Sequence, residues 1–213
     1  MSDPNAFKEF AKKIEMAIEL GKIEVKPDEE VELEEPRQSI AANLFIPPLF
    51  EEARVSDFKP TDFAEREFEV HPPRDLLITG TNGAGKSHLA CALCFEWDMH
   101  RVRAAHICSQ VRGTFNTRAE STERQIISLW ASYKKLVIDD LTAVSTTPHA
   151  IGTLLDLLET RIEDKNITVV TCYQGGKGLK KIDPSIYDRL KGFENVHLTG
   201  ESRRHGSDME RRG

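Results

Sequence analysis

The sequence predicts an α/β domain in which a central parallel β-sheet is flanked by helices. Short runs rich in Val, Ile and Leu alternate with segments whose apolar residues have helical spacing. This alternation is typical of parallel sheets that are buried on both faces. Residues 80–87 read G-T-N-G-A-G-K-S, a glycine loop between an apolar run and a helical stretch. Ligands of such sheets bind at the carboxyl ends of the strands, where this loop lies.

The expected elements follow from these runs. Strands are expected at residues 75–79, 103–108, 135–139, 167–172 and 195–199. Helices are expected at residues 86–99, 121–133, 148–163 and 184–191. The helix expected at residues 148–163 has the clearest start signal, because Thr147 can cap it and Pro148 suits its first position. Its apolar residues then recur at the spacing of one helical face.

The net charge of −6 is unevenly distributed along the chain. Residues 1–70 carry twice as many acidic as basic side chains, and the remainder is mildly basic. This argues against a protein wrapped in DNA but leaves room for a local basic groove. Cys91 and Cys94 form a C-x-x-C inside a predicted helix, without a second pair at zinc spacing, so we interpret them as core residues. No membrane span or secretory signal is visible, which predicts a cytoplasmic location.

The N-terminal part is expected to form an amphipathic helix followed by an acidic linker. Apolar residues recur at helical spacing within residues 4–20, and acidic residues dominate the segment that follows. A lone apolar face can fold back on the main domain or dock on another protein. We interpret residues 1–43 as a partner-binding extension, residues 44–206 as the main domain and residues 207–213 as a disordered tail.

The glycine loop predicts binding of ATP with Mg²⁺. A strand, a glycine turn and a helix start direct backbone N–H groups toward one point, where phosphate binds. Gly83 and Gly85 permit positive φ and a close approach of the backbone. Lys86 is expected to reach the β- and γ-phosphates, and the Ser87 hydroxyl to ligate the metal. The expected nucleotide contacts are Gly80, Thr81, Asn82, Gly83, Ala84, Gly85, Lys86, Ser87 and His88.

The run K-L-V-I-D-D at residues 135–140 predicts the second half of the site. Asp139 is expected to hold Mg²⁺ through water, and Asp140 to orient or deprotonate the attacking water. Many ATP-hydrolysing proteins with such a phosphate-binding loop have Glu at the position of Asp140, so the shorter Asp predicts slow hydrolysis. Hydrolysis also requires a cation near the γ-phosphate. The candidates are Arg161, Arg189 and Arg204.

Several motifs together resemble the DnaC/DnaI helicase loaders and the IstB transposition helpers. The similarity covers roughly residues 44–206 and follows the order of that family. The motifs are I-P-P-L-F at 46–50, V-S-D-F at 55–58, G-K-S-H-L-A at 85–90, L-V-I-D-D at 136–140, D-R-L at 188–190 and G-E-S with Arg204 near the end. The resemblance implies an AAA+ ATPase module with a short N-terminal helical extension.

The resemblance also implies roles for residues outside the loop. Arg189 corresponds to the arginine finger, which acts on the nucleotide of a neighbouring subunit in a homo-oligomer or a mixed assembly. Arg204 is similar to a late arginine that senses nucleotide in its own subunit. Residues 109–132 would carry the extra helical element that faces single-stranded DNA. Its basic and aromatic residues are Arg112, Phe115, Arg118 and Arg124.

Two departures from the family pattern are visible. The fourth strand usually ends Thr-Ser-Asn, and the Asn positions water, but this chain has Tyr173 at that place. Either Gln174 or Thr171 takes the sensor role, or the role is weakened. The N-terminal part is also short and lacks the cysteines of a zinc-bearing loader domain, so residues 4–20 would have to supply the contact with a replicative helicase.

Four functions remain open at this stage. The first is an ATP-dependent loader of a replicative helicase, and the second is an IstB-like helper of a transposase. A small-molecule kinase of the same loop class is disfavoured, because such kinases usually place the loop near the start of the chain. A nucleotide-gated scaffold with little turnover is also compatible with Tyr173 at the sensor position.

Overall fold

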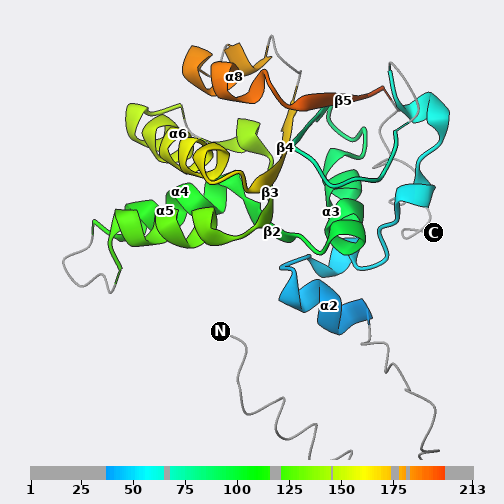
Figure 1. Ribbon diagram of the computed structural model, residues 1–213, viewed down its shortest axis with the longest axis horizontal. Helices are drawn as coiled ribbons and strands as arrows, with labels where there is room; N and C mark the ends of the chain where they lie inside the picture. Colours follow the sequence, from blue (N-terminus) through cyan, green and yellow to red (C-terminus); the bar gives the residue numbers. More distant parts are fainter. Residues whose placement is uncertain are drawn as a thin grey trace, which may run out of the picture.

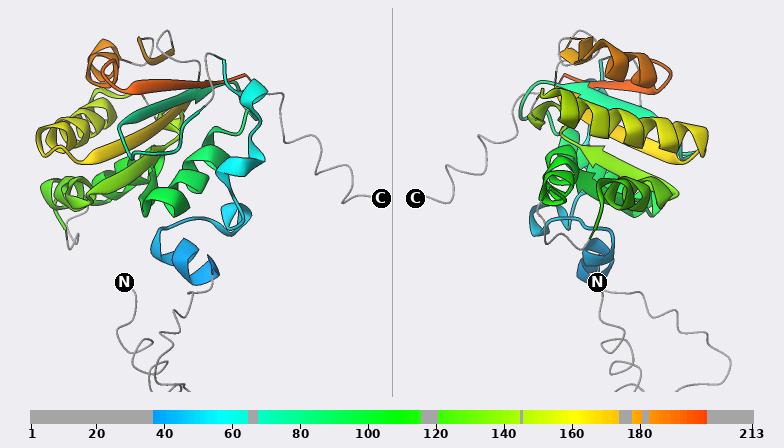
Figure 2. Two further views of the ribbon diagram at one scale, coloured as in Figure 1. Left: turned by 45° about the vertical axis from the view of Figure 1, so that its right-hand side comes forward. Right: turned by 90° about the vertical axis from the view of Figure 1, so that its left-hand side faces the viewer.

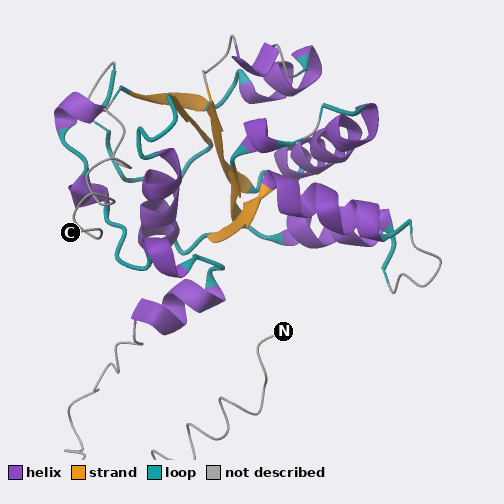
Figure 3. Ribbon diagram, turned by 180° about the vertical axis from the view of Figure 1, so that it is seen from behind, coloured by secondary structure: helices purple, strands orange, loops and turns teal. Residues whose placement is uncertain are grey.

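The computed structural model describes residues 37–64, 68–115, 121–144, 146–173, 178–180 and 183–199. Five parallel strands form one sheet in the order β2-β3-β4-β1-β5. Helix α3 covers one face of this sheet, and α4, α5, α6 and α8 cover the other (Figures 1 and 3). The predicted α/β fold with a central parallel sheet is confirmed.

Four of the five strands lie where the sequence predicts them. They are β1 (Leu76–Gly80), β3 (Lys135–Asp139), β4 (Ile167–Tyr173) and β5 (Glu194–Leu198). The prediction of the second strand at residues 103–108 was wrong. The strand β2 spans His100–Arg103, and α4 (Ala104–Gly113) follows at once. The apolar residues of α4 are buried at helical spacing; they are Ala104, Ile107, Cys108 and Val111. Three of the four residues of β2 are polar, which a strand at the edge of the sheet tolerates.

The remaining helices agree with the sequence to within a few residues. They are α3 (Lys86–Trp97), α5 (Glu123–Ser132), α6 (Pro148–Glu163) and α8 (Pro184–Leu190). The start of α6 has the predicted cap, because Thr147 Oγ1 accepts a hydrogen bond from Ala150 N. The right-hand view of Figure 2 shows α4, α5, α6 and α8 side by side in front of the sheet. Their inward residues form one apolar cluster with that face of the sheet.

The other apolar cluster lies between α3 and the opposite face of the sheet. Cys91 and Cys94 are free thiols inside it and are fully buried, as predicted for core residues. Burial raises the pKa of the Cys91 thiol to about 12, so this side chain is neutral at physiological pH. Among the described residues, no helix has both the length and the apolar character needed to cross a bilayer.

The irregular segment at residues 44–64, called the lead-in below, and the short helix before it belong to this second cluster. Helix α2 (Arg37–Asn43) buries Ala41 and precedes three short 3₁₀ turns, Pro48–Phe50, Val55–Asp57 and Pro60–Asp62. Arg37 donates hydrogen bonds to the carbonyl oxygens of Glu51 (2.7 Å) and Ala53 (2.8 Å). The expected boundary after residue 43 therefore cuts through a packed region, and residues 37–43 lie with the main domain. Residues 1–36, with the expected helix at 4–20, and the expected tail at 207–213 lie outside the described part.

Arg161 is a structural side chain within α6. It is fully buried, and its hydrogen bonds of 2.6–3.2 Å go to Thr168 Oγ1 and to the carbonyl oxygens of Trp130, Ala131, Tyr133 and Ile167. Burial lowers the pKa of Arg161 to about 10, so the guanidinium remains charged at neutral pH. Because it is enclosed within its own domain, Arg161 is not a candidate for the cation beside a γ-phosphate. Sequence alone did not separate it from an exposed arginine.

Candidate nucleotide site

The glycine loop joins β1 to α3 at the carboxyl edge of the sheet. Gly83 and Gly85 have φ of 87° and 96°, the left-handed conformation that the sequence predicts for them. Gly80 also has positive φ, and a Cβ added there would lie 2.5 Å from the carbonyl oxygen of Leu198. The loop therefore depends on glycine both for its turns and for its contact with β5.

The side chain of Lys86 folds back on the first residues of the loop. Its Nζ donates hydrogen bonds to the carbonyl oxygens of Gly80 (3.0 Å) and Thr81 (2.8 Å). The ring of Tyr173, at the end of β4, has its centroid 5.9 Å from the same Nζ. Two backbone carbonyl oxygens thus hold the lysine ammonium against the loop.

Asp139 is buried at the end of β3 and joins three other segments. Its Oδ1 accepts hydrogen bonds from Ser87 Oγ (3.0 Å) and Thr171 Oγ1 (2.5 Å). Its Oδ2 accepts one from Arg101 Nη2, on β2. The structure therefore brings together Ser87 and Asp139, the two residues predicted to hold Mg²⁺. Arg101 was missed, because an arginine in a short polar run gives no sequence signal of burial.

Asp140 follows in a left-handed conformation, with φ of 58°. Such a conformation is uncommon for a residue other than glycine and is often found at functional sites. Its backbone N donates to Thr171 Oγ1 (2.8 Å), and its Oδ1 accepts from Thr142 Oγ1 (3.2 Å). Asp140 is half-buried beside Asp139, and its role toward water stays a prediction.

Of the two sensor candidates, Thr171 is the one that the structure describes. Its hydroxyl donates to Asp139 and accepts from Asp140, so one side chain fixes the spacing of both acids. Gln174 lies outside the described residues, as does Arg204. Their proposed contacts with the attacking water and the nucleotide stay predictions.

His88 faces the lead-in. Its Nε2 lies 2.6 Å from Asp57 Oδ2, and its ring meets Phe50 and Phe58 edge-on. The side chain thus links the first turn of α3 to the segment before β1. A direct contact of His88 with nucleotide stays a prediction.

Arg189 lies on α8 and is held by an acid on α6. Its Nε donates to Glu159 Oε1 (2.9 Å), Nη2 contacts the same oxygen, and Nη1 lies 3.5 Å from Asp188 Oδ2. The side chain is 39% exposed, so it is accessible at the surface of the domain. The sequence singled out Arg189 but gave no indication of Glu159 as its partner.

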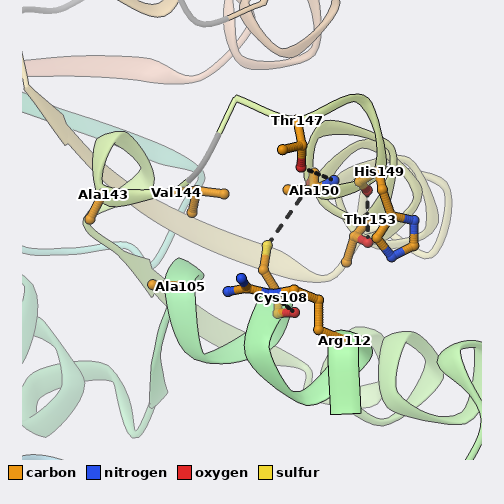
Figure 4. A pocket seen from close by; sticks show the side chains of 9 residues that line it. All are labelled: Ala105, Cys108, Arg112, Ala143, Val144, Thr147, His149, Ala150 and Thr153. Atoms are coloured by element: carbon orange, nitrogen blue, oxygen red, sulfur yellow. Dashed lines mark hydrogen bonds between the residues drawn. The ribbon is translucent and has the colours of Figure 1, made fainter. Parts of the chain in front are cut away.

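The helical element at residues 109–132 corresponds to the end of α4 and to α5, of which residues 116–120, including Arg118, lie outside the described part. Phe115 is 64% exposed, and its ring centroid lies 5.0 Å from that of His149. Figure 4 shows the small cavity between α4 and the start of α6. Its volume is about 120 Å³, and its lining residues are Ala105, Cys108, Arg112, Ala143, Val144, Thr147, His149, Ala150 and Thr153. Arg112 and Arg124 are exposed.

The oxygen donors at the site fit a hard divalent cation. The Ser87 hydroxyl and the Asp139 carboxylate lie within hydrogen-bond distance beside the loop. Within the described ranges, His, Cys, Asp and Glu form no group of three or more that could hold a metal ion. Such a sparse set suits Mg²⁺, which usually takes one or two protein ligands and completes its shell with water and substrate phosphates.

Comparison with curated proteins finds helicase loaders. The chain is 24% identical over 132 residues to "Replicative helicase loader DnaC" of Buchnera aphidicola subsp. Acyrthosiphon pisum (strain APS). The protein of the same description in subsp. Schizaphis graminum (strain Sg) is also 24% identical over 132 residues. The alignments include 59% of this chain and 54% of each relative, so the chain spans about half the length of the curated relatives it matches. No protein-family model matches the chain.

Comparison with solved structures finds the same fold in replication proteins. A DnaC helicase loader has a TM-score of 0.57 at 11% identity, covering 71% of this chain and 99% of that chain. AMPPCP-bound DnaA from Aquifex aeolicus has a TM-score of 0.54 at 15% identity, covering 67% and 46%. The fold is that of an AAA+ P-loop module. The resemblance to replicative helicase loaders is likewise confirmed.

Proposed function

We propose that this chain is an ATP-dependent loader of a replicative helicase. The observation that carries the proposal is the hydrogen bond of 3.0 Å between Ser87 and Asp139, which joins the phosphate loop to the end of β3. This arrangement places a hydroxyl and a carboxylate beside the loop, as Mg²⁺–triphosphate binding requires. The similarity to two DnaC proteins supports helicase loading over the transposase-helper alternative. A cytoplasmic location is part of the same proposal.

Each residue of the site has a defined task in this proposal. The backbone N–H groups of residues 80–87 bind the phosphates, and Lys86 exchanges its loop carbonyls for phosphate oxygens. Bound Mg²⁺, held by Ser87 and Asp139, would neutralise phosphate charge. Asp140 orients the attacking water, and Thr171 keeps the backbone of Asp140 in place. Tyr173 in place of the usual Asn favours slow turnover.

Replacing Lys86 by Ala should weaken ATP binding. The substitution removes the cation that the loop carbonyls hold over the phosphate position, and a charge-assisted hydrogen bond contributes about 1.5–3 kcal/mol. We expect an affinity loss of about 10- to 100-fold. Titration with a fluorescent ATP analogue in the presence of Mg²⁺ measures it, and equal affinity would show that the loop assignment is wrong. Asp140→Asn is the matched control, because it should retain binding and lose hydrolysis.

Arg189 should act on the nucleotide of a neighbouring subunit. It is accessible on α8, and Glu159 holds its guanidinium until a phosphate replaces that acid. An arginine finger contributes about 10³- to 10⁵-fold in rate. Arg189→Ala and Lys86→Ala should each be inactive alone and should recover some ATPase activity when mixed. Lys191→Ala, at the end of the same helix, is the control that should hydrolyse ATP normally. Absence of recovery at every mixing ratio, in protein that still assembles, would exclude a shared site.

The face formed by α4 and α5 is proposed to contact single-stranded DNA. It carries Arg112, Arg124 and the exposed ring of Phe115, and stacking of a base on an aromatic ring contributes about 1–3 kcal/mol. Phe115→Ala should therefore weaken binding of a labelled thymidine oligonucleotide about 5- to 100-fold at fixed salt. Leu49→Ala removes an exposed apolar side chain, 82% accessible, from the turn at Pro48–Phe50, and should leave the affinity unchanged. Unchanged binding by Phe115→Ala would place the DNA on another surface.

Residues 1–36 are proposed to bind the helicase through the apolar stripe within residues 4–20. Deletion should end at residue 36, because α2 packs against the lead-in. Burying the four apolar side chains of this stripe on the partner would contribute roughly 6–10 kcal/mol before ordering and association costs. These side chains are Phe7, Phe10, Ile14 and Ile18. The truncated chain should keep its melting temperature and ATP binding but fail to retain a hexameric replicative helicase in a pull-down.

Phe10→Asp in the full chain should reproduce most of this loss, since it places a charge within the apolar stripe. Full retention of the helicase by both variants would locate the contact on the AAA+ module. Unfolding of the truncated chain would instead show that residues 1–36 complete the core.

A further inference from the structure

The two oxygens of the Asp139 carboxylate have different surroundings. Oδ1 accepts hydrogen bonds from Ser87 and Thr171, and it is the oxygen on the side of the phosphate loop. Oδ2 is paired with the guanidinium of Arg101, which reaches it from β2. The side chains of Arg101 and Asp139 are only 8% and 2% exposed. The acid expected to hold Mg²⁺ thus already has a cation beside it.

The position of Arg101 is difficult to explain by packing alone. It lies on the α3 side of the sheet, close enough to the thiols of Cys91 and Cys94 to act on them electrostatically. Within the described part of the chain, its Nε is buried without a hydrogen-bond partner. A buried guanidinium with an unsatisfied donor destabilises a fold unless a paired charge offsets the cost. Asp139 supplies that charge.

We propose that Arg101 sets the magnesium dependence of nucleotide binding by partly neutralising Asp139. A fixed guanidinium on Oδ2 reduces the net negative charge that a dication meets at Oδ1, and in a poorly solvated site this repulsion is weakly screened. The chain therefore gains less nucleotide affinity from Mg²⁺ than it would with a free carboxylate. The inference rests on the proposed nucleotide site and adds a positioning residue to it.

A purely structural ion pair makes a different prediction. Loss of Arg101 would then lower stability and leave the effect of Mg²⁺ unchanged. If Arg101 sets the charge of the site, its loss leaves Asp139 buried and unpaired, so Mg²⁺ should bind more strongly and restore stability. The response to Mg²⁺ thus separates the two roles.

The first measurement compares the full-length wild type with Arg101→Met, which has a neutral side chain of similar length. A fluorescent ATP analogue is titrated in excess Mg²⁺ and again in EDTA. The readout is the Kd in EDTA divided by the Kd in Mg²⁺. We expect this ratio to rise about tenfold in Arg101→Met, the size of a typical coupling between contacting groups. Arg101→Lys retains the charge and should keep the wild-type ratio. Arg101→Gln provides the same comparison if the methionine variant does not fold.

The second measurement omits nucleotide. Mg²⁺ alone should raise the melting temperature of Arg101→Met and leave that of the wild type nearly unchanged. The double variant Arg101→Met/Asp139→Asn has neither charge, so it should be more stable than Asp139→Asn alone and should not respond to Mg²⁺. This comparison tests the ion pair without depending on ATP.

The outcomes are distinguishable. An equal response of the wild type and the neutral variants to Mg²⁺ in both measurements would overturn the inference while leaving nucleotide binding intact. A double variant no more stable than Asp139→Asn would also overturn it. If the wild type bound no nucleotide in either buffer, the proposed function would fail, and the melting temperatures with Mg²⁺ alone would still decide the role of Arg101.

Discussion

The pairing of the buried Asp139 carboxylate is the interaction on which the rest of the site depends. A charge inside a protein is tolerated only when it is paired and hydrogen-bonded, and Asp139 takes its partners from α3, β2 and β4. The strand order β2-β3-β4 makes this arrangement achievable, because β3 lies between the strands that carry Arg101 and Thr171. The phosphate loop, the sheet edge and the end of β4 are therefore held together by one group.

The sequence predicts the parts of this arrangement that depend on local chemistry. The loop requires glycine where φ is positive, so Gly83 and Gly85 identify its geometry without knowledge of the fold. Runs rich in Val, Ile and Leu predict β3 and β4 because both strands are buried on two faces. The meeting of Ser87 with Asp139 follows from the same logic, since the loop and the acid both end strands of one parallel sheet.

The parts that sequence reasoning missed depend on tertiary position. β2 reads H-R-V-R and resembles a loop, because an edge strand needs less apolar surface than a central one. Arg101 and Arg161 are buried only because carbonyls, hydroxyls or a carboxylate from distant segments surround them. No spacing rule distinguishes such arginines from exposed ones. The sequence places α2 in the N-terminal extension for a related reason, since the packing of α2 depends on the lead-in that folds against α3.

The lead-in and α2 contact α3, the helix that follows the nucleotide loop. His88 comes directly after Ser87, and its ring contacts Asp57, Phe50 and Phe58. Farther upstream, the guanidinium of Arg37 stacks on the ring of Phe95, with its centre 3.9 Å from the ring centroid, so α2 is fixed to the same helix. A displacement of α2 relative to α3 must break these contacts. The contacts of Arg37 and His88 therefore couple the positions of α2 and of residues 44–64 to α3, the helix that begins at Lys86 beside the nucleotide loop.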